Sequence, residues 1–222
     1  QAESPFRKLA LAQGPGKTGF GRPTLQHGLD QFFGQLTREN LRALLVQELG
    51  DGKRLDELVA TPSEAKRSRA ALATGPEFLV HIAAGNIPNP TLMSLVLGLL
   101  TRSAQFVKCG SGAAFLPRLF AHSIYEADHK LGACLEIAEW RGGNAALEEA
   151  FFAAADFFTS TGSDETLAAI RAKLPLRTHF WKHFKTAHPR HVDVGQDQDQ
   201  RRIANFSGAG QRHQRRWRKF HS

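Results

Sequence analysis

The sequence contains little cysteine, methionine or tyrosine, and it has no long apolar run. Its 222 residues include only two cysteines, Cys109 and Cys134, one methionine and one tyrosine. Two cysteines cannot form the multi-bridge framework of a small secreted domain, and they fit a reducing compartment. We therefore expect a cytoplasmic protein that is stabilised by an apolar core and not by disulfide bonds.

Signals for membranes and for secretion are also missing. The most apolar run, Leu92 to Leu100, is interrupted by Ser94 and Gly98, and it has about half of the ~20 residues that a membrane span needs. The first residues, Gln1–Ser4, contain no basic and apolar leader. We expect neither a transmembrane helix nor a secretory signal. The first residue is not methionine, which indicates a fragment or a start further upstream.

The excess positive charge is confined to the C-terminal end. The whole chain carries 29 Lys and Arg against 21 Asp and Glu, a net charge of +8. Residues 176–222 hold 11 of these basic and 3 of these acidic residues, so 11 − 3 accounts for all of it. The rest of the chain is therefore neutral, and only the tail suits a polyanionic partner.

The first third of the chain predicts short helices. Residues 1–35 are rich in glycine and weakly periodic, and Gly14–Thr18 has the wrong spacing for a phosphate-binding loop, so we expect a flexible loop there. Leucines then recur at helical spacing between Thr37, a suitable N-cap, and Gly50, a suitable stop. A second helix near 55–59 and a third over 63–73 complete a predicted helical N-terminal segment, residues 1–75.

Strands and helices alternate over the next hundred residues. Short apolar runs predict strands, and each is followed by a helical pattern. The predicted strands are 78–82, 105–108, 134–140 and 156–159, and the predicted helices are 88–100, 114–127, 144–151 and 164–173. This alternation is typical of an α/β fold, a parallel sheet with helices on both faces. We assign residues 76–175 to that domain and residues 176–222 to a basic tail.

The loops after the strands are the predicted ligand site. Parallel sheets bind ligands at the carboxyl ends of their strands, where helix N-termini attract phosphate. These loops all contain glycine, which allows a ligand to approach the backbone closely. They are Gly85–Asn86, Cys109–Gly112, Arg141–Gly143 and Ser160–Ser163.

Several strings occur in the order and spacing of one known family. They are Ala84–Pro88, Phe106–Lys108, Trp140–Gly143 and Phe158–Thr166. From about Thr37 to Pro175 the sequence resembles the acyl-CoA reductase (LuxC) family, a branch of the aldehyde dehydrogenase superfamily. The resemblance implies an aldehyde dehydrogenase-like Rossmann domain and NADPH-dependent reduction of a fatty acyl-CoA to a fatty aldehyde, as in bacterial bioluminescence. It also implies an acyl-transfer partner protein.

The resemblance assigns roles to five residues. Lys108 matches the lysine that binds the adenosine ribose of the cofactor, and Ser111 stands where NAD-preferring members carry a glutamate. A neutral hydroxyl there leaves room for a 2′-phosphate, which favours NADPH. Gly162 and Ser163 match the segment beside the pyrophosphate. Asn86 matches the asparagine that stabilises the oxyanion, although an asparagine in a tight turn would look the same.

The family's nucleophilic cysteine has no counterpart in this sequence. No cysteine follows Cys134, and we expect both cysteines to be packing residues. The chain is then the cofactor-binding part of a reductase and inactive alone. After Pro175 the apolar pattern fades, which predicts a disordered or frame-shifted tail.

A different class of function remains open. A non-catalytic binding module could use the basic tail to contact nucleic acid or acidic partners. Basic residues bind any polyanion non-specifically, so the tail does not indicate nucleic acid in particular. His179, His183 and His188 have no acidic or cysteine partner nearby, so we predict no metal site.

Overall fold

A computed structural model describes residues 4–83 and 88–184 of the chain. These residues fall into two units. The first unit contains residues up to Gly34 and the sheet domain from Gly75 onward, and the second contains residues 35–74. None of the described helices is long and apolar enough to cross a membrane.

The sheet domain is built on five parallel strands. They are β1 (Phe78–Ile82), β2 (Ala104–Cys109), β3 (Leu135–Glu139), β4 (Phe157–Gly162) and β5 (His179–Phe184). Their order is β3-β2-β1-β4-β5, and each neighbouring pair is parallel. The chain reverses its direction across the sheet between β1 and β4, which makes this pair the topological switch point.

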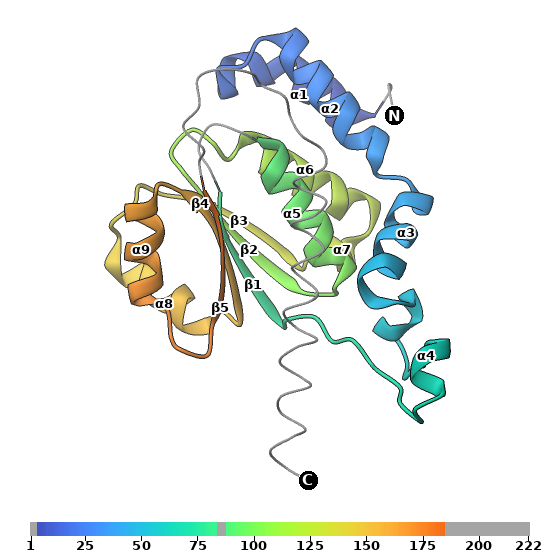
Figure 1. The fold of residues 1–222 in the computed structure, drawn as a ribbon. Helices are drawn as coiled ribbons and strands as arrows, with labels where there is room; N and C mark the ends of the chain where they lie inside the picture. The colour runs from blue at the N-terminus through green and yellow to red at the C-terminus, as the bar shows by residue number, and fades with distance from the viewer. Residues whose placement is uncertain (1–3, 84–87, 185–222) are drawn as a thin grey trace. The chain divides into compact units, whose positions relative to one another are not determined.

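Helices cover both faces of the sheet, which confirms the predicted α/β fold. The crossover helices are α5 (Pro88–Leu100), α6 (Phe115–Ala127), α7 (His129–Gly132), α8 (Ala145–Ala154) and α9 (Asp164–Lys173). Figure 1 shows α8 and α9 on one side of the sheet and α5 and α6 on the other. Right-handed crossovers explain this distribution, because the winding direction changes at the switch point.

The face below α8 and α9 carries the aromatic core. Val80 and Phe158 point from the central strands into a cluster with Phe151, Phe152 and Ile170. Phe151 stacks on Phe158 with ring centres 6.0 Å apart. Ile82 and Trp140 also pack against the cluster, so it extends toward the carboxyl ends of β1 and β3.

The opposite face holds a buried polar network in its centre. The His81 ring nitrogens lie 2.7 Å from Thr159 Oγ1 and 3.1 Å from Gln105 Oε1. Gln105 Nε2 donates to the backbone oxygen of Leu95, 3.0 Å away. Because the Gln105 oxygen must then accept, His81 donates to it from Nε2.

Two N-terminal helices replace the predicted flexible loop. They are α1 (Pro5–Thr18) and α2 (Arg22–Gln35). Gly14–Thr18 lies inside α1, where a Cβ on Gly14 would come within 2.8 Å of Leu25 Cδ1. Phe6 and Phe32 pack edge-on against Phe120 of α6. Packing therefore outweighs the low helix propensity of the glycines and Pro15.

The second unit confirms one predicted helix and corrects two others. Helix α3 (Arg38–Leu49) begins at the Thr37 cap and ends at Gly50, as predicted. The helix predicted near 55–59 is a 3₁₀ turn, η1 (Gly52–Leu55), and Val59 pairs with Ala71 in an isolated bridge. The helix predicted over 63–73 is the single turn α4 (Pro62–Ala65).

Strand β5 is not among the strands predicted from the sequence. The predicted basic tail begins at 176, yet residues 179–184 pair with β4. Thr178 is buried and donates to the backbone oxygen of Ala155, 2.9 Å away, and Phe180 packs against the aromatic core. The remainder of the predicted tail lies outside the described residues.

Candidate functional site

Three of the four predicted ligand loops lie at the carboxyl edge of the sheet. The turn after β2, the turn after β3 and the β4–α9 junction all fall among the described residues. Asn86 and the loop that contains it lie outside them. The site below is therefore built from the ends of β2, β3 and β4.

Lys108 lies at the end of β2, on the face that α8 and α9 cover. It is in register with Ile82 of β1 and Ala138 of β3, and Ile82 is in register with Ser160 of β4. Partners in parallel register point to the same face, and two strand spacings separate Lys108 from Ser160 by about 10 Å. The Lys108 ammonium lies 5.8 Å from the centre of the Trp140 ring, a cation–π contact.

Gly162 and Ser163 form the junction between β4 and α9. Gly162 is the last residue of β4, and Ser163 is the N-cap of α9, whose hydroxyl oxygen accepts from Thr166 N at 3.4 Å. A hydrogen bond from Ser163 also holds the pKa of the Glu165 carboxyl below its usual value. The Ser163 hydroxyl is thus engaged in capping, and the backbone N–H groups of the first turn are the donors that α9 offers to an anion.

Lys108 and Ser163 lie on the same side of the sheet. Helix α9 packs on the face that carries Lys108, because Ile170 belongs to the aromatic core below it. Lys108 is the penultimate residue of β2, and Ser163 directly follows β4. A positive side chain and a helix N-terminus therefore lie on either side of the topological switch point, where open α/β sheets bind their ligands.

Two buried polar atoms on this face have no hydrogen-bond partner among the described residues. They are the hydroxyl oxygen of Ser160 and the indole nitrogen Nε1 of Trp140. Ser160 is only 1% exposed. A buried polar group without a partner costs about 1–3 kcal/mol, so these atoms suit a polar ligand or an ordered water at the site. The residues present therefore fit a dinucleotide cofactor.

Two glycine turns beside the site are held by carboxylates. Gly112 and Gly143 have left-handed backbone angles, with φ of 78° and 94°. Gly112 N lies 2.5 Å from Glu139 Oε1, and Gly143 N lies 2.9 Å from Glu148 Oε1. These two amides are satisfied within the chain, so they do not serve as phosphate donors while the carboxylates hold them. Ser111, exposed beside Gly112, is presented by this held turn.

Glu148 connects the β3–α8 turn to Lys173 of α9. Lys173 Nζ lies 3.1 Å from Glu148 Oε2. The Gly143 amide, then Lys173 and finally Lys108 lower the pKa of the Glu148 carboxyl. The carboxylate is therefore charged at neutral pH and balances the two lysines.

Neither cysteine is placed for nucleophilic catalysis at this edge. Cys109 is fully buried, and desolvation raises the pKa of its thiol to about 11, so the reactive thiolate is rare at neutral pH. Cys134 directly precedes β3 and lies at the amino end of that strand, not within it as predicted. It is exposed, so only Cys109 is a packing residue.

Ser160 and Trp140 lie in stretches that the sequence singled out, but they had no role of their own there, and Glu139 and Glu148 were not singled out at all. Alternation within β4 places Ser160 on the side of Gly162, which was a usable signal. The carboxylate contacts depend on turns that no local pattern specifies.

His179 packs within the sheet domain, because its ring stacks on Phe157 with ring centres 6.0 Å apart. The described residues contain no group of three potential metal ligands.

The chain is similar to a known protein family. A family model described as acyl-CoA reductase (LuxC) matches residues 3–190. No curated protein matches the chain. Among solved structures, the γ-glutamyl phosphate reductase of Thermotoga maritima is 11% identical, with a TM-score of 0.46 over 78% of this chain and 42% of that one. The chain thus spans about two fifths of that reductase. Because the family model covers most of its length, the chain belongs to the acyl-CoA reductase (LuxC) family.

Proposed function

We propose that this chain binds NADPH across the carboxyl ends of its strands and provides the hydride-donor site of a reductase that converts fatty acyl-CoA to fatty aldehyde. The family supports a reductase with a nicotinamide cofactor. The observation that carries the proposal is the unpartnered Ser160 hydroxyl, buried in the same row of the sheet as Lys108.

Lys108, Ser111 and the start of α9 have separate roles in this proposal. Lys108 binds the adenosine ribose, and Ser111 leaves space beside it for a 2′-phosphate. The pyrophosphate lies on the amide side of the Gly162–Ser163 junction. Asp164 and Glu165 stabilise the N-terminus of α9 but repel a phosphate, so the phosphate contacts the backbone and not these side chains.

Trp140 connects Lys108 to the aromatic core beside the proposed cofactor site. Trp140 packs against the core residues and holds the Lys108 ammonium over its ring. The Lys108 charge is thereby fixed in position before a ligand arrives, which lowers the cost of binding. When bound, NADPH supplies the hydride that reduces the acyl carbon. Asn86 stays the proposed donor to the oxyanion, on the resemblance alone.

The acyl-accepting nucleophile is not among the described cysteines. Cys109 is buried with a raised pKa, and Cys134 lies at the opposite edge of the sheet from the proposed cofactor. We therefore expect this chain to bind the cofactor without turning over fatty acyl-CoA. Acyl-CoA reductase activity that survives replacement of both cysteines by alanine would contradict this assignment.

Ser160→Ala tests the cofactor site by separating binding from stability. Removal of a buried hydroxyl without a partner should leave the free energy of unfolding unchanged or raise it. Loss of the donor should weaken NADPH binding, measured by calorimetric titration, by about 10-fold. Ser123→Ala is the control, because Ser123 Oγ already donates to the Phe120 oxygen at 2.7 Å. Equal NADPH affinity in both variants, or none in the wild type, contradicts the proposal.

A further inference from the structure

A hollow lies on the other face of the sheet from Lys108, next to the turn that follows β2. Its volume is about 550 Å³, and Phe115 and Leu119 of α6 form its apolar wall. Gly112 and Glu139 line the end nearest the carboxyl edge of the sheet. We call it the α6 groove. Its elements all belong to the first unit.

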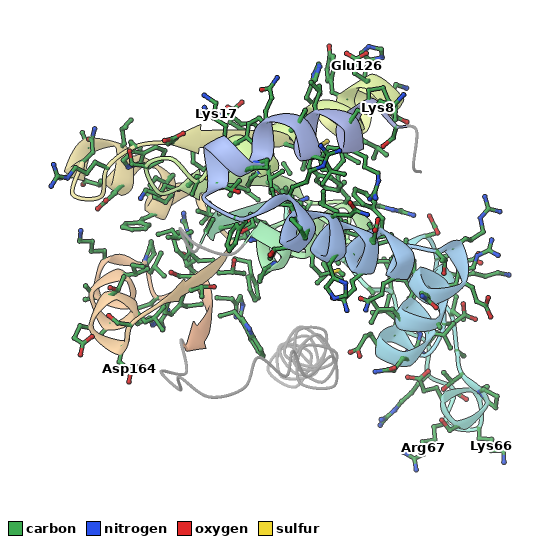
Figure 2. The ribbon with its side chains drawn as sticks, turned by 90° about the horizontal axis from the view of Figure 1, so that it is seen from above. Lys8, Lys17, Lys66, Arg67, Glu126 and Asp164 are labelled. Carbon is green, nitrogen blue, oxygen red and sulfur yellow. The ribbon has the colours of Figure 1, made fainter. Side chains whose placement is uncertain are left out.

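Basic side chains from two helices line the α6 groove. Lys17 comes from the last turn of α1, and Figure 2 shows it at the opposite end of that helix from Lys8. Arg118 and His122 are one turn apart on α6. Lys17 belongs to Gly14–Thr18, whose spacing does not match a phosphate-binding loop. In the structure it lines the α6 groove instead.

Arg118 pairs with the carboxylate that holds the β2 turn. Its Nη1 lies 3.6 Å from Glu139 Oε2, while Glu139 Oε1 accepts from the Gly112 amide. The Arg118 side chain is 54% exposed. An ion pair that is this long and this exposed contributes little to stability. Arg118 Nε also donates to the Ile137 backbone oxygen at 3.4 Å, so the terminal nitrogens can turn from Glu139 to a stronger anion at low cost while Nε keeps its bond.

The α6 groove begins where the proposed ribose site ends. Ser111 precedes Gly112, and Gly112 lines the groove. Because Lys108 lies on the face covered by α8 and α9 and the groove lies on the α6 face, a substituent on the cofactor's adenosine ribose reaches the groove by passing over the β2 turn at Ser111. In NADPH that substituent is a phosphate monoester, which arginine binds with two parallel hydrogen bonds and lysine binds as a point charge.

We propose that the α6 groove receives the 2′-phosphate of NADPH, with Arg118 and Lys17 as its charge partners. This inference rests on the proposed function and adds the residues that select NADPH over NADH. Arg118 turns from Glu139 to the phosphate, and Glu139 keeps the Gly112 amide. Glu139 limits the affinity, because its negative charge lies at the mouth of the groove. Lys108 then serves the ribose and not the phosphate.

The test is a calorimetric titration of the chain with NADPH, NADH, adenosine 2′,5′-bisphosphate and adenosine 3′,5′-bisphosphate. Arg118→Ala should weaken binding of NADPH and of the 2′,5′-bisphosphate by about 10-fold or more and leave NADH unchanged. Lys17→Ala should act in the same direction with a smaller loss. Lys130→Ala, an exposed lysine on α7 outside the groove, controls for net charge and should change nothing.

Glu139→Gln gives a result in the opposite direction. The glutamine oxygen can still accept from the Gly112 amide, while the repelling charge is gone and Arg118 is released. NADPH should bind more tightly and NADH equally well. A gain in affinity cannot come from misfolding, and thermal melting of each variant shows whether the alanine variants fold.

Three results would overturn the groove proposal. If NADPH is preferred over NADH to the same extent in Arg118→Ala and wild type, the phosphate lies elsewhere and the proposed function survives. If the 3′,5′-bisphosphate binds as tightly as the 2′,5′-bisphosphate, the groove does not bind a 2′-phosphate selectively. If the wild-type chain binds none of the four ligands, the proposed function fails together with the inference.

Discussion

The carboxylate of Glu148 accepts a hydrogen bond from the backbone amide of Gly143, with the two atoms 2.9 Å apart. Gly143 has a φ of 94°, a conformation that side chains other than glycine rarely adopt. The bond links the first turn of α8 to the end of the β3–α8 turn. It therefore fixes the loop that carries Trp140 into position under Lys108.

Glu148→Ala should lower the free energy of unfolding by about 2 kcal/mol, because the amide loses a charged acceptor. Glu148→Gln keeps an acceptor and loses only the contact with the half-exposed Lys173, so its loss should stay below about 1 kcal/mol. Because the pKa of Glu148 is lowered in the folded chain, its carboxylate contributes its full stabilisation above pH 4.5, the ordinary pKa of the group. That stabilisation is lost as the pH falls through the lowered pKa of the folded state. Urea denaturation at neutral and acidic pH measures both effects, and equal losses for the two variants would contradict the role of the amide bond.

The two thiols should differ sharply in reactivity. Cys109 is buried with a pKa raised to about 11, whereas Cys134 is exposed. Iodoacetamide should label only Cys134 in the folded chain, and Cys109 after unfolding, as mass spectrometry would show. Because the pKa of Cys109 is raised in the folded chain, the buried thiol favours folding fully below pH 9.0, the ordinary thiol pKa. The free energy of unfolding then falls as the pH rises towards 11. Rapid labelling of Cys109 in the native chain would contradict its burial.

Glycine-to-alanine substitution should have opposite effects at two helical positions. A Cβ on Gly98 would lie 2.2 Å from the Gln105 side chain, which His81 and Leu95 hold in place. Gly98→Ala should destabilise the fold by about 3 kcal/mol through overpacking and a broken network. A Cβ on Gly34 would meet nothing within 4 Å, so Gly34→Ala should be neutral or stabilising by up to ~1 kcal/mol. Chemical denaturation measures both, and a harmless Gly98→Ala would mean that Gln105 is free to move.

Truncation after residue 184 should leave cofactor binding intact. Strand β5 ends at Phe184, so the shortened chain keeps every described strand, whereas truncation after 175 removes β5 and exposes β4. The first variant should keep wild-type affinity for NADPH, and the second should unfold at a lower temperature. Loss of NADPH binding on removal of 185–222 alone would favour the alternative in which the basic tail forms the binding site.

The strands and helices of the sheet domain could be predicted because each pattern has a local cause. Strand β1 and helix α9 have the bounds that apolar runs and the Ser163 cap indicate. Strand β5 could not be recognised, because Lys182 and His183 interrupt its apolar pattern and it pairs on one side only. Helix α1 was missed for the opposite reason, since contacts with α6 outweigh the unfavourable residues Gly14, Pro15 and Gly16.

Part of the site followed from the same local rules. Lys108, Gly162 and Ser163 come after apolar runs, and parallel strands bring their carboxyl ends together. Ser160 and Trp140 have no local signal for an unpartnered atom, because that state depends on the packing of α8 and α9. The contact between Gly112 and Glu139 joins residues 27 positions apart, and only the pairing of β2 with β3 brings them together.

Replacement of Lys108 by methionine tests the central claim most directly. Methionine keeps an apolar stem against Trp140 and removes the charge. The account predicts that Lys108→Met binds NADPH at least about 10-fold more weakly than the wild-type chain in a calorimetric titration, while the control Lys130→Ala binds it equally well. Equal affinity of Lys108→Met and wild type for NADPH would contradict a cofactor site at the end of β2.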